Sequence, residues 1–135
     1  MDAKRAMAQI REYRIEEAAD ALIEVLTARE RLPVPAAVPK REVVGLVALQ
    51  AERARRREAF IYKPAIEGRA VKVPDQAFVL ANWRAICRVC AAAGFYVVMQ
   101  RGKGGGIRLG TLQEYRGTKL PKPDPETQPI RAGLA

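Results

Sequence analysis

Residues 94–110 read GFYVVMQRGKGGGIRLG, and the rest of the chain is best interpreted outward from this stretch. Two short runs rich in β-branched and aromatic residues, FYVVMQ and GIRLG, flank a turn made of Arg, Gly and Lys. Strand-forming runs separated by a glycine-containing turn predict a β-hairpin. Its tip would be cationic and nearly free of bulky side chains, so the backbone N–H groups there can approach an anion closely.

The glycine-rich turn has two interpretations that stay open. It can be an ordinary flexible hairpin turn, because glycine suits tight turns. It can also be a contact for a phosphate backbone. It is not a Walker loop, since no Ser or Thr follows the lysine and no helix is expected directly after the loop.

Composition favours a nucleic-acid partner. The chain has 135 residues, 49% of them hydrophobic, and a formal net charge of +9 with a pI near 10.1. This length predicts one domain with a real core, and the positive excess attracts polyanions, with an anionic membrane or an acidic protein as weaker options. The sequence contains no apolar run of membrane-spanning length and no signal peptide, so we expect a cytoplasmic protein without membrane contact.

The positive charge is segregated along the chain. Residues 1–31 hold six Lys/Arg against seven Asp/Glu, a net of −1. Residues 40–57 hold six against two and residues 94–120 five against one, each a net of +4. Such segregation is typical of a binding face. In the first basic segment, four arginines exceed what capping a helix C-terminus requires and predict phosphate contact. They are Arg53, Arg55, Arg56 and Arg57.

Four segments follow from the pattern of apolar residues and prolines. Residues 1–31 predict a helix whose apolar stripe, between Ile15 and Leu26, would pair two copies or dock on a partner. Residues 32–39, LPVPAAVP, form a proline-rich linker, and residues 119–135 are too polar and proline-rich to order themselves. Residues 40–118 form the main domain, which opens with a helix from Lys40 to about Glu58.

The order of elements in the main domain predicts a winged helix-turn-helix, a mainly α fold with a small β-hairpin. Residues 60–73 offer two short strand-like runs around a proline and a glycine. Next comes a helical region over residues 74–93, interrupted near Asn82. Gly94 follows it directly, at the position after a helix C-terminus where glycine is favoured because the backbone adopts a positive φ. The hairpin then forms the wing.

The stretch AAAGFYVVMQRGKGGGIRLG resembles the end of the DeoR/WYL-type and biotin-repressor-like winged-helix domains. In those domains a recognition helix ends on a glycine, and a strand, a glycine-rich basic wing and an RLG sequence follow. The resemblance covers Asp75 to Gly110. The positions that match the pattern are Gly94, Gly104, Gly105, Gly106, Arg108, Leu109 and Gly110.

This resemblance implies a recognition helix over residues 82–93 and a wing that enters the minor groove or grips phosphate. Asn and Arg are the side chains that bind adenine and guanine edges in the major groove. The nucleic-acid-binding residues implied are Asn82, Arg84, Arg88, Arg101, Lys103 and Arg108. Two blander interpretations stand beside it: Trp83 is more simply explained as a core residue than as a base-stacking one, and Arg84 and Arg88 can form a solvated stripe.

Catalysis, metals and cofactors are not expected. Cys87 and Cys90 form the only cysteine pair, inside a predicted helix, and the chain has no histidine. The simplest interpretation is two small buried hydrophobic residues. Acidic residues lie mostly in the first 31 residues, so no carboxylate cluster for metal-assisted hydrolysis stands near the basic segments.

The function expected from the sequence is that of a small regulator of transcription, of the kind carried by phages or mobile elements, which binds double-stranded DNA and dimerises through the N-terminal helix. The alternative is a protein-binding winged-helix module that targets a host complex such as RNA polymerase or a CRISPR effector. RNA binding is a third option. It is disfavoured because the chain lacks the aromatic sheet face on which single-stranded bases stack.

Overall fold

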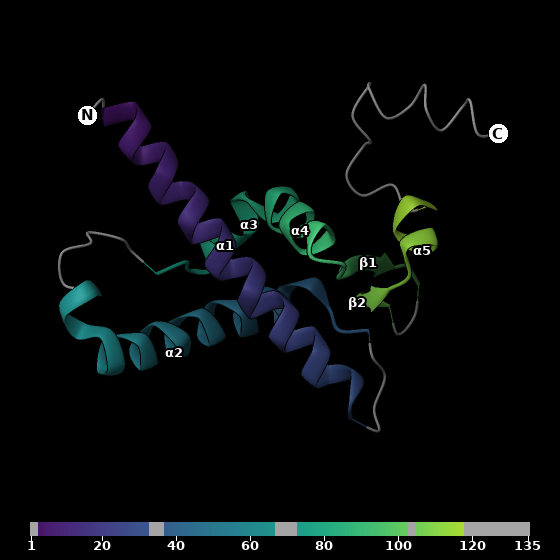
Figure 1. Ribbon diagram of the computed structural model, residues 1–135. Coiled ribbons are helices and arrows are strands. Elements are labelled where there is room, and N and C mark those ends of the chain that lie inside the picture. The colour runs from purple at the N-terminus through teal and green to yellow at the C-terminus, as the bar shows by residue number, and fades with distance from the viewer. Residues whose placement is uncertain (1–2, 33–36, 67–72, 103–104, 118–135) are drawn as a thin grey trace.

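The computed structural model describes residues 3–32, 37–66, 73–102 and 105–117 (Figure 1). The elements in chain order are α1 (Ala3–Glu30), α2 (Lys40–Ile66), α3 (Gln76–Ala81), α4 (Trp83–Ala92), β1 (Tyr96–Gln100), β2 (Gly106–Gly110) and α5 (Leu112–Gly117). The expected fold class, mainly α with a small antiparallel β-hairpin, is confirmed. None of the described helices is long and apolar enough to cross a membrane. The predicted disordered tail, residues 119–135, lies outside the described residues.

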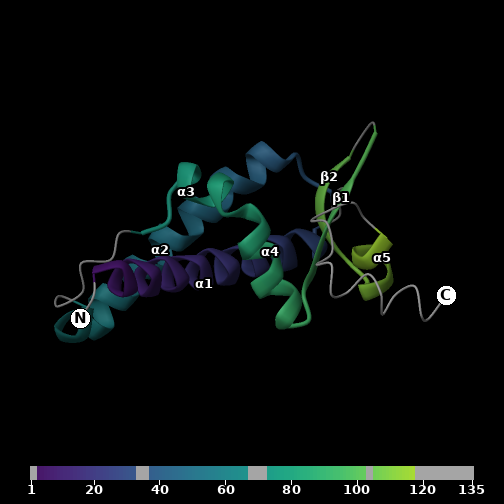
Figure 2. The same cartoon turned by 90° about the horizontal axis from the view of Figure 1, so that it is seen from above.

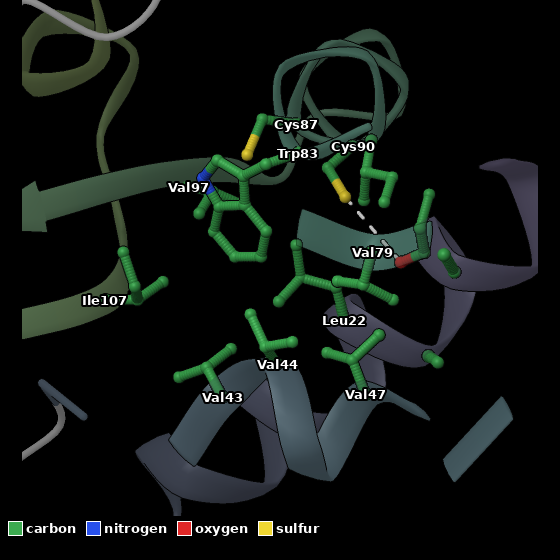
Figure 3. Packing of buried hydrophobic residues seen from close by; sticks show 14 of the residues in the cluster. Leu22, Val43, Val44, Val47, Val79, Trp83, Cys87, Cys90, Val97 and Ile107 are labelled. Atoms are coloured by element: carbon green, nitrogen blue, oxygen red, sulfur yellow. Dashed lines mark hydrogen bonds between the residues drawn. The ribbon is translucent and has the colours of Figure 1, made fainter. Parts of the chain in front are cut away.

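One core joins α1, α2, α3, α4 and the hairpin (Figure 3). Leu22 of α1 faces the valines of α2, and Trp83 of α4 lies between them and the strands. Burying a side chain such as Leu or Val stabilises the fold by about 1.5–3 kcal/mol. The fully buried members supplied by the different elements include Leu22, Leu26, Val43, Val47, Val79, Ile86, Val97 and Ile107.

The N-terminal helix is part of this core and not a separate unit, which corrects the predicted division between residues 1–31 and 40–118. Its apolar stripe faces α2 and α4, and Ala18, Ala19 and Leu22 are fully buried there. The alanines let the neighbouring helices come close, and Cys90 of α4 donates its S–H to the Ala19 carbonyl at 3.6 Å. The stripe is therefore covered by the chain's own helices and needs no second copy to be buried, while dimerisation or docking through α1 stays a prediction.

Helix α2 is longer than the sequence pattern indicated. It was expected to end near Glu58, before strand-like runs in residues 60–73, but it continues to Ile66. A helix that has already formed extends at little cost, and its propagation overrides the moderate strand preference of FIY. The strand prediction is wrong for residues 60–66, and residues 67–72 lie outside the described residues.

The segment before α2 adds one residue to the edge of the two-stranded sheet. Val38 pairs with Ile107 of β2 as an isolated antiparallel bridge. Its N–H donates to the Ile107 carbonyl at 2.9 Å, and the Ile107 N–H donates back at 2.6 Å. The end of the predicted linker 32–39 is thus fixed to the hairpin, directly before α2 begins.

The pair α3–α4 has the boundaries that its capping residues predict. Asp75 caps α3 by accepting a hydrogen bond from the Phe78 N–H at 2.8 Å. Asn82 separates α3 from α4, as expected. Gly94 has φ of +87°, and Phe95 beside it donates to the Cys90 carbonyl at 2.9 Å, a Schellman end of α4. This tight turn sends β1 back along α4.

The hairpin has the predicted arms, and its glycines have structural causes. Met99 is paired with Ile107 and Gln100 with Gly106. Gly106 has φ of +149°, and a Cβ there would lie 2.2 Å from the Val38 carbonyl oxygen. A Cβ at Gly105 would lie 2.2 Å from the carbonyl oxygen of Gln100. Two of the tip glycines are thus required by the backbone, whether or not a ligand approaches.

Candidate nucleic-acid interface

Helix α4 presents a smooth cationic face to the outside. Its four buried side chains, among them Trp83 and Cys87, recur at helical spacing and turn inward. Arg84 and Arg88 are exposed on the opposite side, one turn apart. The small Ala81 and Ala85 and the exposed Leu80 line the same surface.

An open groove of about 390 Å³ lies at the start of α4. Four cationic side chains from three helices line it, and Leu80, Ala81, Asn82, Trp83 and Ala85 complete the lining. None of these lining residues is acidic. The cations are Arg11 of α1, Lys40 of α2, and Arg84 and Arg88 of α4.

Arg11 and Lys40 were not among the residues predicted from the sequence. Arg11 belongs to the segment with a net negative charge, and 71 positions separate it from its partner Asn82. No local pattern could connect residues so far apart. Lys40 was recognised only as the start of a helix, yet its Nζ lies 5.1 Å from the centre of the Trp83 ring.

The Asn82 amide is engaged within the protein. Its Oδ1 accepts a hydrogen bond from Nε of Arg11 at 3.0 Å, and its Nδ2 donates to the Phe78 carbonyl at 2.9 Å. The side chain is half-buried and does not cap α4. Reading an adenine edge through Asn82 would require both of these bonds to break, so the structure does not present it as a free base contact.

Strand β1 runs back toward the side of the molecule from which α4 starts. In Figure 2, α4 runs toward the lower edge of the view, and β1 returns toward the upper edge. Arg101 follows β1 directly and is exposed. The predicted tip residue Lys103 lies outside the described residues. The bridge of Val38 to Ile107 attaches the turn end of the hairpin to a residue two positions before Lys40, which lines the groove.

Arg108 serves the hairpin itself and is not available to a phosphate. Its Nε donates to Oε1 of Gln100 at 3.0 Å, and its guanidinium forms an ion pair with Glu114 of α5. The hydrogen bond to Glu114 raises the pKa of Arg108. The same bond, with those to Thr111, lowers the pKa of Glu114 to about 2.

This ion pair is joined to a capping box that begins α5, an element not predicted from the sequence. The Glu114 N–H donates to Oγ1 of Thr111 at 3.1 Å, and the Thr111 N–H donates to Oε1 of Glu114 at 3.0 Å. The rings of Tyr96 and Tyr115, 5.6 Å apart, hold α5 against β1.

The arginines of α2 lie apart from α4 and the hairpin. The second half of α2 extends away from both in Figures 1 and 2. Arg55 is only 9% exposed, forms an ion pair with Glu17 of α1 and lies 5.3 Å from the Tyr13 ring. Its prediction as a phosphate contact is therefore wrong, because it holds α1 to α2.

The remaining predicted arginines of α2 are at the surface. Arg56 forms an ion pair with Glu52 one turn earlier. Arg53 and Arg57 are exposed. They carry charge to a part of α2 that does not adjoin the groove.

The cysteines and the tryptophan belong to the core, as the simpler interpretations predicted. Cys87 and Cys90 are buried free thiols, and burial raises the pKa of each to about 12. Trp83 is 4% exposed, so its ring cannot stack on a base. Within the described ranges, no group of three or more His, Cys, Asp or Glu side chains could hold a metal ion.

No family model matches this chain, and neither does any curated protein or solved structure. The winged-helix relationship therefore stays a prediction. The groove, α4 and the hairpin are the features from which a function can be argued.

Proposed function

We propose that the protein binds double-stranded DNA with the outer face of α4 and the hairpin, and that it acts in the cytoplasm as a small regulator of transcription. The observation that carries this proposal is the groove at the start of α4, where four cations from three helices meet with no acidic side chain in the lining. A surface that concentrates positive charge in this way suits a polyanion.

Shape supports the same proposal. Helix α4 is exposed along the side that carries Arg84 and Arg88, and the major groove is wide enough to admit an α-helix. Strand β1 runs back toward the side from which α4 starts, and Arg101, which follows β1, is exposed (Figure 2). A duplex that meets α4 can therefore also meet the hairpin.

The test is a titration of a short fluorescent duplex by anisotropy at several salt concentrations. Each phosphate neutralised by the protein contributes about −0.9 to the slope of log K against log salt. The triple variant Arg84→Ala, Arg88→Ala, Arg101→Ala should weaken binding and flatten this slope by roughly 2 to 3.

The matched control removes the same charge from α2, in the variant Arg53→Ala, Arg56→Ala, Arg57→Ala. It should bind nearly as well as the unchanged protein. If both triple variants weaken binding equally, the assignment of the surface is wrong. If the unchanged protein does not bind a duplex at low salt, the proposed function is wrong.

A second candidate function, docking on a protein complex of the host, is favoured by an open groove of about 590 Å³ between α2 and the start of α3. Ala48, Leu49, Val73 and Pro74 line much of it, and Leu49 is 43% exposed. Exposed apolar side chains of this kind are typical of protein contacts. Leu49→Ser would abolish such docking and leave duplex binding unchanged, which separates the two functions in a pull-down from host extract.

A further inference from the structure

Within the part of the chain that the structure describes, the cations of the groove at the start of α4 have no acidic partner. Among the described residues, no ion pair is formed by Lys40, Arg84 or Arg88, whereas Arg55 and Arg108 each have a glutamate. Like charges that converge without a counter-charge repel one another, and an anion between them removes this repulsion. Unlike Arg55 and Arg108, which each have a glutamate partner, these cations converge on one groove with no acidic side chain in its lining.

Two of the four cations are held in position by the protein. Arg11 is oriented by Asn82, which accepts from its Nε at 3.0 Å and is itself fixed by the bond to Phe78. Because Asn82 engages only Nε of Arg11, the two Nη groups can donate to a ligand. The ammonium of Lys40 lies over the buried Trp83 ring. Charged groups that are already positioned lose less entropy when they bind.

The helix termini at the groove favour negative charge as well. The first turn of α4 contains Arg84 and no acidic residue, and the Asn82 side chain holds Arg11 instead of capping the helix. Lys40 is the first residue of α2, whose first turn also contains the acidic Glu42. Helix N-termini carry partial positive charge, so the cation in the first turn of α4, which has no acidic neighbour in that turn, is unfavourable unless an anion lies close by.

We infer that this groove binds phosphate oxyanions and that, within the proposed function on which this inference rests, it holds the sugar–phosphate backbone and not base edges. The guanidinium of Arg11 and the ammonium of Lys40 are donors of the kind that phosphate oxygens accept. The Asn82 amide, which could have recognised a base, positions Arg11. The start of α4 then fixes the protein on the duplex without selecting a sequence.

The first arm of the test uses inorganic phosphate alone, added to the full chain labelled for amide NMR. Saturable shifts should appear at Arg11, Lys40 and the first turn of α4, and Arg11→Ala should remove them. Arg53→Ala, which deletes an exposed arginine outside the groove, should leave them unchanged. Shifts that do not saturate, or that appear equally across the basic surface, overturn the inference.

The second arm uses two duplexes of unrelated sequence, titrated by anisotropy. Arg11→Ala should weaken binding to both by the same factor, about tenfold, and reduce the salt slope by about 1. A loss that differs between the duplexes would show that the groove reads bases, and a loss no larger than that of Arg53→Ala would show that it does not touch the nucleic acid. Saturable phosphate binding without duplex binding would refute the proposed function and leave the phosphate site standing.

Discussion

Gly106→Ala is the substitution that most directly tests how the hairpin is attached to the helices. The new Cβ would lie 2.2 Å from the Val38 carbonyl oxygen and 2.3 Å from its carbon, both backbone atoms that cannot swing aside. The backbone φ of +149° at this position also disfavours any residue with a Cβ. The variant must therefore shift either β2 or the segment that leads into α2.

The cost follows from two contributions. Holding a non-glycine residue in a disfavoured backbone region costs about 1–3 kcal/mol. Separating Val38 from Ile107 breaks two hydrogen bonds, of 2.9 and 2.6 Å, each with a net value of about 0.5–1.5 kcal/mol. We therefore expect Gly106→Ala to lower the free energy of unfolding by about 3 kcal/mol, a large part of the roughly 5–15 kcal/mol of a typical domain.

Urea unfolding followed by circular dichroism measures this loss. Gly102→Ala is the matched control: its φ is +95°, but nothing lies within 4 Å of the new Cβ, so only the backbone contribution remains, about 1–2 kcal/mol. Equal losses for the two variants would show that the contact with Val38 is unimportant. A Gly106→Ala protein within about 0.5 kcal/mol of the unchanged one would refute the described pairing.

Three further predictions concern charges and thiols. Glu17→Ala leaves the buried Arg55 without the carboxylate of its ion pair, and it should lower the free energy of unfolding by about 3 kcal/mol in the same urea assay. The control replaces both partners, Glu17→Met with Arg55→Met, and its free energy of unfolding should stay within about 1 kcal/mol of that of the unchanged protein. Because the hydrogen bond to Arg108 lowers the pKa of Glu114 to about 2 in the folded protein, its stabilising effect is complete above the unfolded value near 4.5 and is lost as the pH falls toward 2. The difference in urea midpoint between the unchanged protein and Glu114→Gln should therefore shrink over this range, and a constant difference would contradict the role of the ion pair. Burial raises the pKa of both cysteine thiols to about 12, so little reactive thiolate is present at pH 8. Their reaction with iodoacetamide, followed by mass spectrometry, should be about 10³-fold slower in the native protein than in urea. Comparable rates would show that the thiols are accessible.

The features predicted correctly are those with local signals. The arms of the hairpin, the glycine end of α4 and the interruption at Asn82 each follow from a few consecutive residues. The cysteines and Trp83 were predicted to be buried from residue type alone. The basic character of residues 40–57 and of the hairpin segment was also visible in the sequence, because charge can be counted without knowing the fold.

The features predicted wrongly depend on contacts between distant segments. Arg55 stands in a basic cluster, but its partner Glu17 is on α1, 38 positions away. The apolar stripe of α1 could cover a second copy or the chain's own helices, and only the packing decides between them. Gly106 was considered as part of a flexible turn or a phosphate contact, and neither interpretation included the backbone of Val38 that lies against it. Arg11 was not predicted at all. Its place in the groove depends on its hydrogen bond to Asn82, and no periodic pattern of residues in the sequence indicates that contact.

Trp83 gives the molecule a built-in optical reporter. It is the chain's single tryptophan, it lies under the Lys40 ammonium, and it forms part of the groove wall while its ring packs in the core. A cation near an indole shifts its emission, so withdrawal of Lys40 toward an anion should change the fluorescence of the unlabelled protein. Occupancy of the groove can thus be followed by light alone, with Lys40→Met as the variant in which the signal should disappear.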